Sequence, residues 1–138
     1  MLRDYEAVLK AAADPNRARV LKMLEQGELC VCQIVAVLGL SGSTVSKHLS
    51  LLLAAGLVDE RKTGRWVHFR LAESARNEYA TPLLSLVHKW LREDPVVRAD
   101  VERVARVRQI SVEELCSLSP TALRSELAAA TAKGASRG

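Results

Sequence analysis

Aromatic residues, histidines, cysteines and long apolar runs are all scarce in this chain of 138 residues. Only 4% of the residues are aromatic, so the core must consist mainly of Leu, Val and Ala, a composition that favours helices. No apolar run is long enough to span a bilayer, and the N-terminus lacks the apolar segment of a signal peptide. These absences predict a cytoplasmic protein without a membrane partner.

The sequence also lacks the patterns that indicate an enzyme. It contains no nucleophile–base pair, Gly-rich phosphate loop or carboxylate pair at mechanistic spacing, so we expect neither catalysis nor an organic cofactor. The formal net charge is +4, and residues 29–71 hold five Lys or Arg against two acids. A positive excess concentrated in one unit suits a polyanionic partner such as DNA.

The stretch 41–56 predicts an amphipathic helix whose polar face is left free. Its apolar stripe comprises Val45, Leu49, Leu52 and Leu53, and the opposite face comprises Ser43, Ser46, Lys47 and Ser50. Ser41 is a suitable N-cap and Gly56 a suitable C′ residue. Short hydroxyls with one cation suit a helix in the major groove, whereas the stretch taken alone also fits an ordinary surface helix.

The neighbouring segments favour a winged helix-turn-helix. A short helix is expected over 28–38, and a Gly-containing turn joins it to the next helix. Residues 57–71 form two extended runs around 62–65, and alternation in the second run predicts a β-hairpin with Gly64 at its tip. Helices are also expected over 4–13, over 15–26 after the cap Asp14, and beyond Glu73. In that last part Thr81-Pro82 is a cap and first helical residue or a kink, Asp94-Pro95 starts another helix, and Ser119-Pro120 starts a last one. We predict a mainly α fold with a small hairpin, in which 1–92 form the DNA-binding and dimerisation domain, 93–132 a C-terminal helical extension and 133–138 a disordered tail.

The three cysteines, Cys30, Cys32 and Cys116, are the sharpest chemical feature. In a reducing compartment they are expected as thiols or metal ligands rather than disulfides. Residues i and i+2 lie about 200° apart around an α-helix, so Cys30 and Cys32 share one ion only if that turn unwinds or the helix starts later. Thiolates select soft or borderline ions such as arsenite, antimonite, Cd, Pb, Zn or Cu(I). The alternative is small buried side chains, and for Cys116 both interpretations stay open.

Several motifs occur in an order that resembles the ArsR/SmtB repressors. They are Asp14-Pro-Asn-Arg17, Glu28-Leu-Cys-Val-Cys32, the segment 40–49, Ala55-Gly-Leu-Val58 and Gly64-Arg-Trp66. The resemblance covers roughly residues 5–91. It implies a homodimeric winged-helix repressor that pairs through its N- and C-terminal helices, binds a palindromic operator in double-stranded DNA and leaves it when an inducer binds.

The resemblance also implies which inducer to expect. The Cys30/Cys32 pair matches the thiolate site of the family's arsenite sensors, which often have a third cysteine where this chain has Val35. Cys116, from either subunit, is the candidate substitute, and a two-coordinate site is the alternative. Residues 1–29 contain no cysteine, which argues against the cadmium/lead branch. His88 is the only histidine after residue 68, which argues against the zinc branch.

From these observations we predict a repressor that dissociates from DNA when trivalent arsenic or antimony binds Cys30, Cys32 and Cys116. A sensor of a soft divalent metal, a thiol redox switch or a metal buffer without an operator are the alternatives. Gly42 stands where family members often have Gln. Arg61, Lys62 and Arg65 are expected to grip phosphate or the minor groove from the wing, and the alternative for them is a solvated hairpin tip. For His48, packing and DNA contact are both expected roles. The predicted DNA-binding residues are Ser43, Thr44, Ser46, Lys47, His48, Ser50, Lys62 and Arg65.

Overall fold

The computed structural model describes residues 1–73 and 76–118. Its elements, in chain order, are α1 (Leu2–Ala13), α2 (Pro15–Leu24), β1 (Leu29–Cys30), α3 (Val31–Leu38), α4 (Gly42–Ala54), β2 (Val58–Thr63), β3 (Trp66–Leu71), α5 (Ala80–Lys89), α6 (Pro95–Val107) and α7 (Val112–Ser117). The mainly helical class with a winged helix-turn-helix is therefore confirmed. The expected helix after Ser119 and the tail 133–138 lie outside the described residues.

Capping residues set most of the helix starts where the sequence predicts them. The Asp14 side chain accepts hydrogen bonds from the N–H groups of Asn16 and Arg17, and the Ser41 hydroxyl accepts one from the Thr44 N–H. One expectation is wrong, because α5 begins at Ala80 rather than at the expected cap Thr81. Pro82 is tolerated there since the first turn of a helix has no internal partner for its N–H groups.

A third strand, β1, is the main difference from the expected fold. The sheet order is β1-β3-β2, all antiparallel, and Leu29 pairs with Phe69 and Cys30 with His68. The expected helix over 28–38 is therefore wrong at its start, because the chain stays extended through Cys30 and α3 begins at Val31. Pairing of two residues with a distant strand overrides the local helical pattern.

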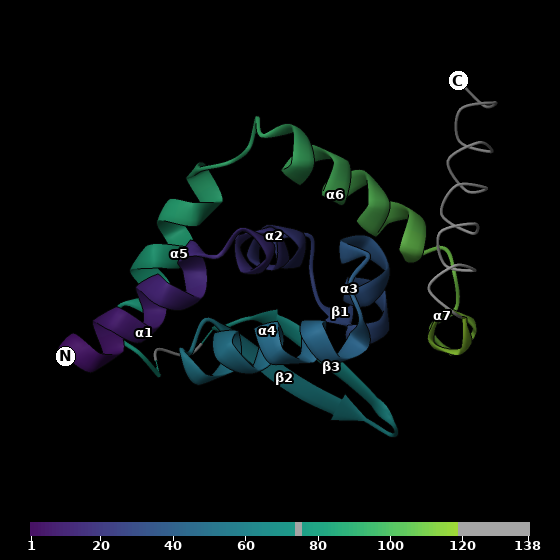
Figure 1. Cartoon of the computed structure of the whole chain (residues 1–138), viewed down its shortest axis with the longest axis horizontal. Coiled ribbons are helices and arrows are strands. Elements are labelled where there is room, and N and C mark those ends of the chain that lie inside the picture. Colours follow the sequence, from purple (N-terminus) through teal and green to yellow (C-terminus); the bar gives the residue numbers. More distant parts are fainter. Residues whose placement is uncertain (74–75, 119–138) are drawn as a thin grey trace.

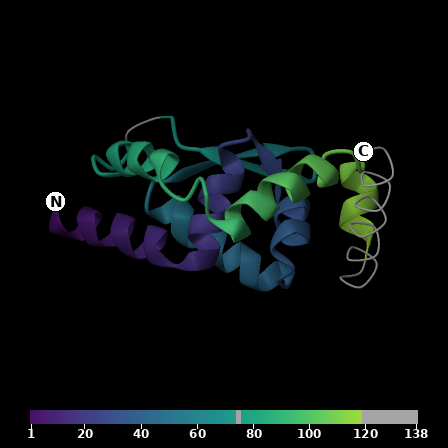
Figure 2. The ribbon, with the colours of Figure 1, turned by 90° about the horizontal axis from the view of Figure 1, so that it is seen from above.

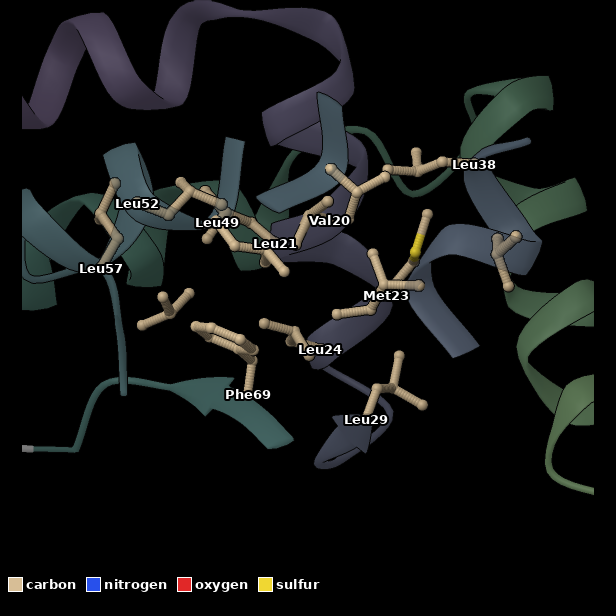
Figure 3. Packing of buried hydrophobic residues seen from close by; sticks show 14 of the residues in the cluster. Val20, Leu21, Met23, Leu24, Leu29, Leu38, Leu49, Leu52, Leu57 and Phe69 are labelled. Atoms are coloured by element: carbon tan, nitrogen blue, oxygen red, sulfur yellow. The ribbon is translucent and has the colours of Figure 1, made fainter. Parts of the chain in front are cut away.

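The core holds the recognition helix α4 against α2. Leu21 of α2, Leu49 and Leu52 of α4, and Leu57 are each less than 2% exposed, and Phe69 of β3 closes the same cluster (Figure 3). These residues bury the apolar stripe that the sequence predicts for α4. In Figure 1, α2 lies between α6 and α4, and the hairpin lies below α2 together with α4.

The C-terminal extension crosses back over the winged-helix unit. Helix α6 packs on α2 and α3, and α7 packs on α3. Both views show α1 and α5 at one end of the long axis and α7 at the other (Figures 1 and 2). Among the described residues, no single helix is long and apolar enough to cross a membrane. Helices α3 and α4 together meet that length and composition but are bent by 113°.

Candidate thiol site and DNA-binding face

The three cysteines come together at the start of α3. Their sulfur atoms all lie within 4.8 Å of one another, and all three belong to one chain. Cys30 is the extended N-cap of α3 (φ −74°, ψ 151°), and its N–H donates to Gln33 Oε1 at 2.8 Å. The helix thus starts later than expected. Because Cys30 precedes the helix, the two thiols of the Cys-x-Cys pair can share a site without unwinding it.

Cys32 and Cys116 are joined by a disulfide that links α3 to α7, with their Cα atoms 5.4 Å apart. The sequence favours thiols or metal ligands over disulfides for all three cysteines, and the structure differs at this pair. Cys30 is the free cysteine and is buried. Proximity explains the difference, since Cys116 lies 84 positions after Cys32 and only the fold brings the two together.

A buried ion pair holds the extension that carries Cys116. The Arg19 guanidinium donates to both Asp100 carboxylate oxygens, at 2.8 and 2.9 Å, and Asp100 is only 1% exposed. Leu115, also buried, fixes α7 in the core next to Cys116. Sequence reasoning missed this pair. The available signal is that Asp100 interrupts the apolar face of α6 between Val97 and Val104.

Glu28, just before β1, is a second residue that sequence reasoning missed. Its two carboxylate oxygens accept hydrogen bonds from Arg61 Nε and Nη2, both at 2.9 Å. The Arg61 guanidinium holds the pKa of the Glu28 carboxyl below its ordinary value. The Glu28 carbonyl oxygen also accepts a hydrogen bond from Arg108 at 3.3 Å. Arg61, expected to grip phosphate, is therefore already paired within the protein.

The other predicted DNA-binding residues lie mostly on open surface. Thr44 is exposed, but its hydroxyl accepts a hydrogen bond from the Ser41 hydroxyl at 2.8 Å. On the wing, the Arg65 guanidinium lies 4.5 Å from the centroid of the Trp66 ring, a cation–π geometry. Besides Thr44, the exposed residues of the predicted set are Ser43, Ser46, Lys47 and Ser50 of α4, and Lys62 and Arg65 of the wing.

His48 differs from the rest of that set because it is partly buried. Its Nδ1 lies 3.2 Å from Arg17 Nη1. This contact supports the packing role that the sequence left open. Because His48 Nδ1 contacts Arg17 within the protein, only the rest of the His48 ring is available for a DNA contact.

Comparisons with known proteins agree with this architecture. A family model described as "Bacterial regulatory protein, arsR family" matches residues 14–60, which run from the N-cap of α2 into β2. The arsenical resistance operon repressor of Escherichia coli K12 is 37% identical over 100 residues, covering 72% of this chain and 83% of that protein. Reduced HlyU from Vibrio cholerae superposes with a TM-score of 0.56 at 31% identity, covering 66% of this chain and 92% of that one.

A further solved relative is the cadmium metal sensor CMTR from Mycobacterium tuberculosis. It has a TM-score of 0.50 and 34% identity, and the match covers 64% of this chain and 84% of that one. The family match falls on the helix-turn-helix, and the E. coli repressor extends the similarity over most of both chains. The chain therefore belongs to the arsR family of bacterial regulatory proteins and is a transcriptional regulator rather than an enzyme.

Proposed function

We propose that this protein is a homodimeric transcriptional repressor that leaves its operator DNA when trivalent arsenic or antimony binds Cys30, Cys32 and Cys116. The observation that carries the proposal is the three-sulfur cluster, whose atoms all lie within 4.8 Å. Because an operator-binding repressor works where the DNA is, the proposal includes a cytoplasmic location.

The donor set favours a metalloid over a divalent metal. Within the described residues, no His, Asp or Glu joins the three sulfurs at that distance. Structural Zn²⁺ sites almost always have four ligands in a tetrahedron. Trivalent arsenic takes three sulfurs readily: arsenous acid condenses with three thiols, which forms three As–S bonds and releases three waters. The resemblance of the Cys-Val-Cys pair to the arsenite sensors points the same way.

The thiol form of the site requires two electrons to reduce the Cys32–Cys116 bond, and cellular thiol systems supply them. Sulfurs bound to one ion at about 2.3 Å lie about 3.8 Å apart in tetrahedral geometry. The Cys32 and Cys116 sulfurs, which are bonded to each other here, must therefore move apart on reduction, whereas the Cys30 sulfur already lies within 4.8 Å of both and has to approach them only slightly.

Two exposed surfaces support the DNA-binding and dimer parts of the proposal. The exposed hydroxyls and Lys47 of α4 and the basic wing tip provide a face for a duplex. Large hydrophobic side chains remain exposed on α1 and near the end of α5, where a partner subunit would cover them. They are Leu2, Tyr5, Leu9, Leu86, Trp90 and Leu91, with exposures from 39% to 83%.

A mobility-shift titration of the reduced protein tests the arsenic assignment. Arsenite should release the wild type from its operator, and Cys32→Ser and Cys116→Ser should both need far more arsenite. Thiol counting on the same samples should show three thiols consumed per arsenic in the wild type. Equal potency on Cys32→Ser, or no release of the wild type, would refute the assignment. Stronger release by cadmium than by arsenite would favour the soft-metal alternative.

The Cys32–Cys116 disulfide specifically favours one competing function, a thiol redox switch on the same DNA-binding scaffold. One thiol would lose its proton and attack hydrogen peroxide as the thiolate, and the released proton would convert the leaving hydroxide to water, giving a sulfenic acid. The second thiol would condense with the sulfenic acid to give the disulfide and a second water.

Cys30 distinguishes the two functions, because it is a proposed arsenic ligand but lies outside the disulfide. Under the arsenic proposal, Cys30→Ser should respond poorly to arsenite. Under the redox alternative, Cys30→Ser should still leave DNA on peroxide treatment, and peroxide should release the wild type at doses where arsenite does not.

A further inference from the structure

We infer that Glu28 couples the thiol site to the wing through its ion pair with Arg61. This inference rests on the proposed function, because it assigns the residues by which the occupied site changes the DNA-binding face. Neither residue belongs to the sulfur cluster, and Arg61 is engaged with Glu28 on the protein itself. The pair is thus a positioning element for the wing.

The sheet register connects the cysteines to the wing directly. Cys30 pairs with His68 of β3, and His68 pairs with Arg61 of β2, so Cys30 and Arg61 belong to one row across the sheet. The neighbouring row contains Leu29, Phe69 and Glu60. Strand β1 is only two residues long, and it places Cys30 two strands away from Arg61 of the hairpin, with β3 between them.

Glu28 bridges the outer strands over this sheet. From the residue before β1, its carboxylate reaches Arg61 on β2 through two hydrogen bonds of 2.9 Å. Two parallel bonds fix orientation as well as distance, which a single contact does not. The same residue accepts the bond from Arg108, at the end of α6, through its carbonyl oxygen. Glu28 is therefore where the wing, the Cys30 strand and the extension carrying Cys116 meet.

The Glu28–Arg61 pair can transmit a movement of the cysteines although it contributes little to the stability of the fold. Binding of one ion by all three sulfurs draws Cys30 toward Cys32 and Cys116 and so displaces the adjoining β1, and Glu28 transfers that displacement to Arg61. The hairpin follows as a unit, because β2 and β3 pair over six consecutive positions. Arg61 is 54% exposed and Glu28 30% exposed, and exposed ion pairs contribute little to stability. Removing the pair should therefore change coupling more than folding.

The test uses the full-length reduced protein, and matched proteins with Trp66→Phe give the Trp90 signal to be subtracted, so that the difference reports on Trp66 of the hairpin. Glu28→Gln, Arg61→Gln and the double variant are compared with Asp59→Asn. Asp59 makes a similar exposed ion pair at the base of β2, with Arg76 at 3.0 Å, but does not contact β1 through it. For each protein, Trp66 fluorescence is recorded against arsenite without DNA, arsenite affinity is measured, and operator affinity is measured with and without arsenite.

We expect arsenite to change Trp66 fluorescence and to lower operator affinity in the parent and in Asp59→Asn. In Glu28→Gln and Arg61→Gln, arsenite affinity should stay within about twofold, while the arsenite-induced loss of operator affinity should shrink at least about fivefold. The double variant should lose no more of the arsenite response than either single variant, because the two substitutions remove the same interaction.

Two results would overturn the inference: an unchanged fluorescence response and release in Glu28→Gln and Arg61→Gln, or an equal loss of response in Asp59→Asn. Failure of arsenite to bind the parent, or binding without release, would instead count against the proposed function. The DNA-free fluorescence measurement still tests the link from site to wing when release fails.

Discussion

The Arg17 guanidinium contacts His48 on the recognition helix, with 3.2 Å between Arg17 Nη1 and His48 Nδ1. The same guanidinium donates to the carbonyl oxygens of Ala11 at 2.8 Å and Lys10 at 3.2 Å. One side chain thus ties the end of α1 to α4. Helix α1 also carries exposed apolar residues suited to a partner subunit. The Arg17 contacts therefore link the orientation of α4, the recognition helix, to the position of α1 in the proposed dimer.

Replacing Arg17 with Lys should weaken both folding and DNA binding. Lysine keeps the charge but cannot reproduce the forked donor geometry. We expect the free energy of unfolding to fall by about 1–2 kcal/mol, measured by urea denaturation. Arg98→Lys, at an exposed pair with Glu93, is the control and should change little. If His48→Ala lost operator affinity while Arg17→Lys kept it, His48 would be a direct DNA contact instead.

The N-cap Asp14 should make stability pH-dependent. Burial alone would raise the pKa of Asp14, but hydrogen bonding to the Arg17 N–H and the nearby charges of Arg17 and His48 outweigh it, so its pKa lies below the ordinary 3.8. A carboxyl with a lowered pKa stabilises the fold above its unfolded-state pKa, and this contribution is lost as the pH falls through the folded-state pKa.

Asp14→Asn isolates that charge, because asparagine retains the capping acceptor. Unfolding free energies of both proteins should be measured across acid pH. The advantage of the wild type should be full above about pH 4 and shrink toward zero at lower pH. An advantage that grows on acidification would contradict the assignment.

Gly42, the first residue of α4, should accept a side chain. A Cβ at this position meets no atom within 4 Å, and the residue is exposed. We expect Gly42→Gln and Gly42→Ala both to gain about 0.5 kcal/mol of stability by restricting the unfolded chain. Only glutamine can read a base edge. Tighter operator binding by Gly42→Gln than by Gly42→Ala would show that this position faces DNA, and equal binding would show that it does not.

Salt dependence should reveal which basic residues meet phosphate. Each of Lys47→Gln, Lys62→Gln and Arg65→Gln should reduce the slope of log K against log salt by about 1, because one fewer counterion is released. Fluorescence anisotropy with labelled operator at several salt concentrations gives the slope. Arg98→Gln, on α6, is the control and should leave it unchanged. An unchanged slope for both wing variants would remove the wing from the interface.

The buried Arg19–Asp100 pair should be necessary for both stability and the thiol site. Arg19→Met leaves buried Asp100 with Arg103, at 3.2 Å, as its one remaining partner among residues 1–73 and 76–118, so we expect a loss of about 3 kcal/mol. Arsenite affinity should fall with it, because α6 no longer holds α7 and Cys116 in place. Arg106→Met, at a more exposed pair with Glu102, should cost less than about 0.5 kcal/mol. A loss of stability without a loss of arsenite affinity would separate Cys116 from the site.

The sequence alone determined the elements whose signals are local. Asp14, Ser41 and Asp94 cap the helices that begin after them, because a side-chain oxygen satisfies N–H groups within three residues. Gly56 ends α4 and Gly64 turns the hairpin at positive φ, values of 75° and 60° that side chains disfavour. The apolar stripe of α4 and the alternation in β3 were likewise readable, since periodicity reports which face is buried.

Tertiary structure decided what depends on residues far apart in the chain. Strand β1 exists because Leu29 and Cys30 pair with β3, about forty positions later, and this pairing moves the start of α3 beyond Cys30. The junction at Glu28 and the anchor at Asp100 likewise join side chains that no local period relates. Cys116 reaches Cys30 and Cys32 only because the Arg19–Asp100 pair and Leu115 bring α6 and α7 back onto α3. The sequence identifies the three cysteines as candidate ligands, but only the packing of α6 and α7 on α3 brings their sulfurs together.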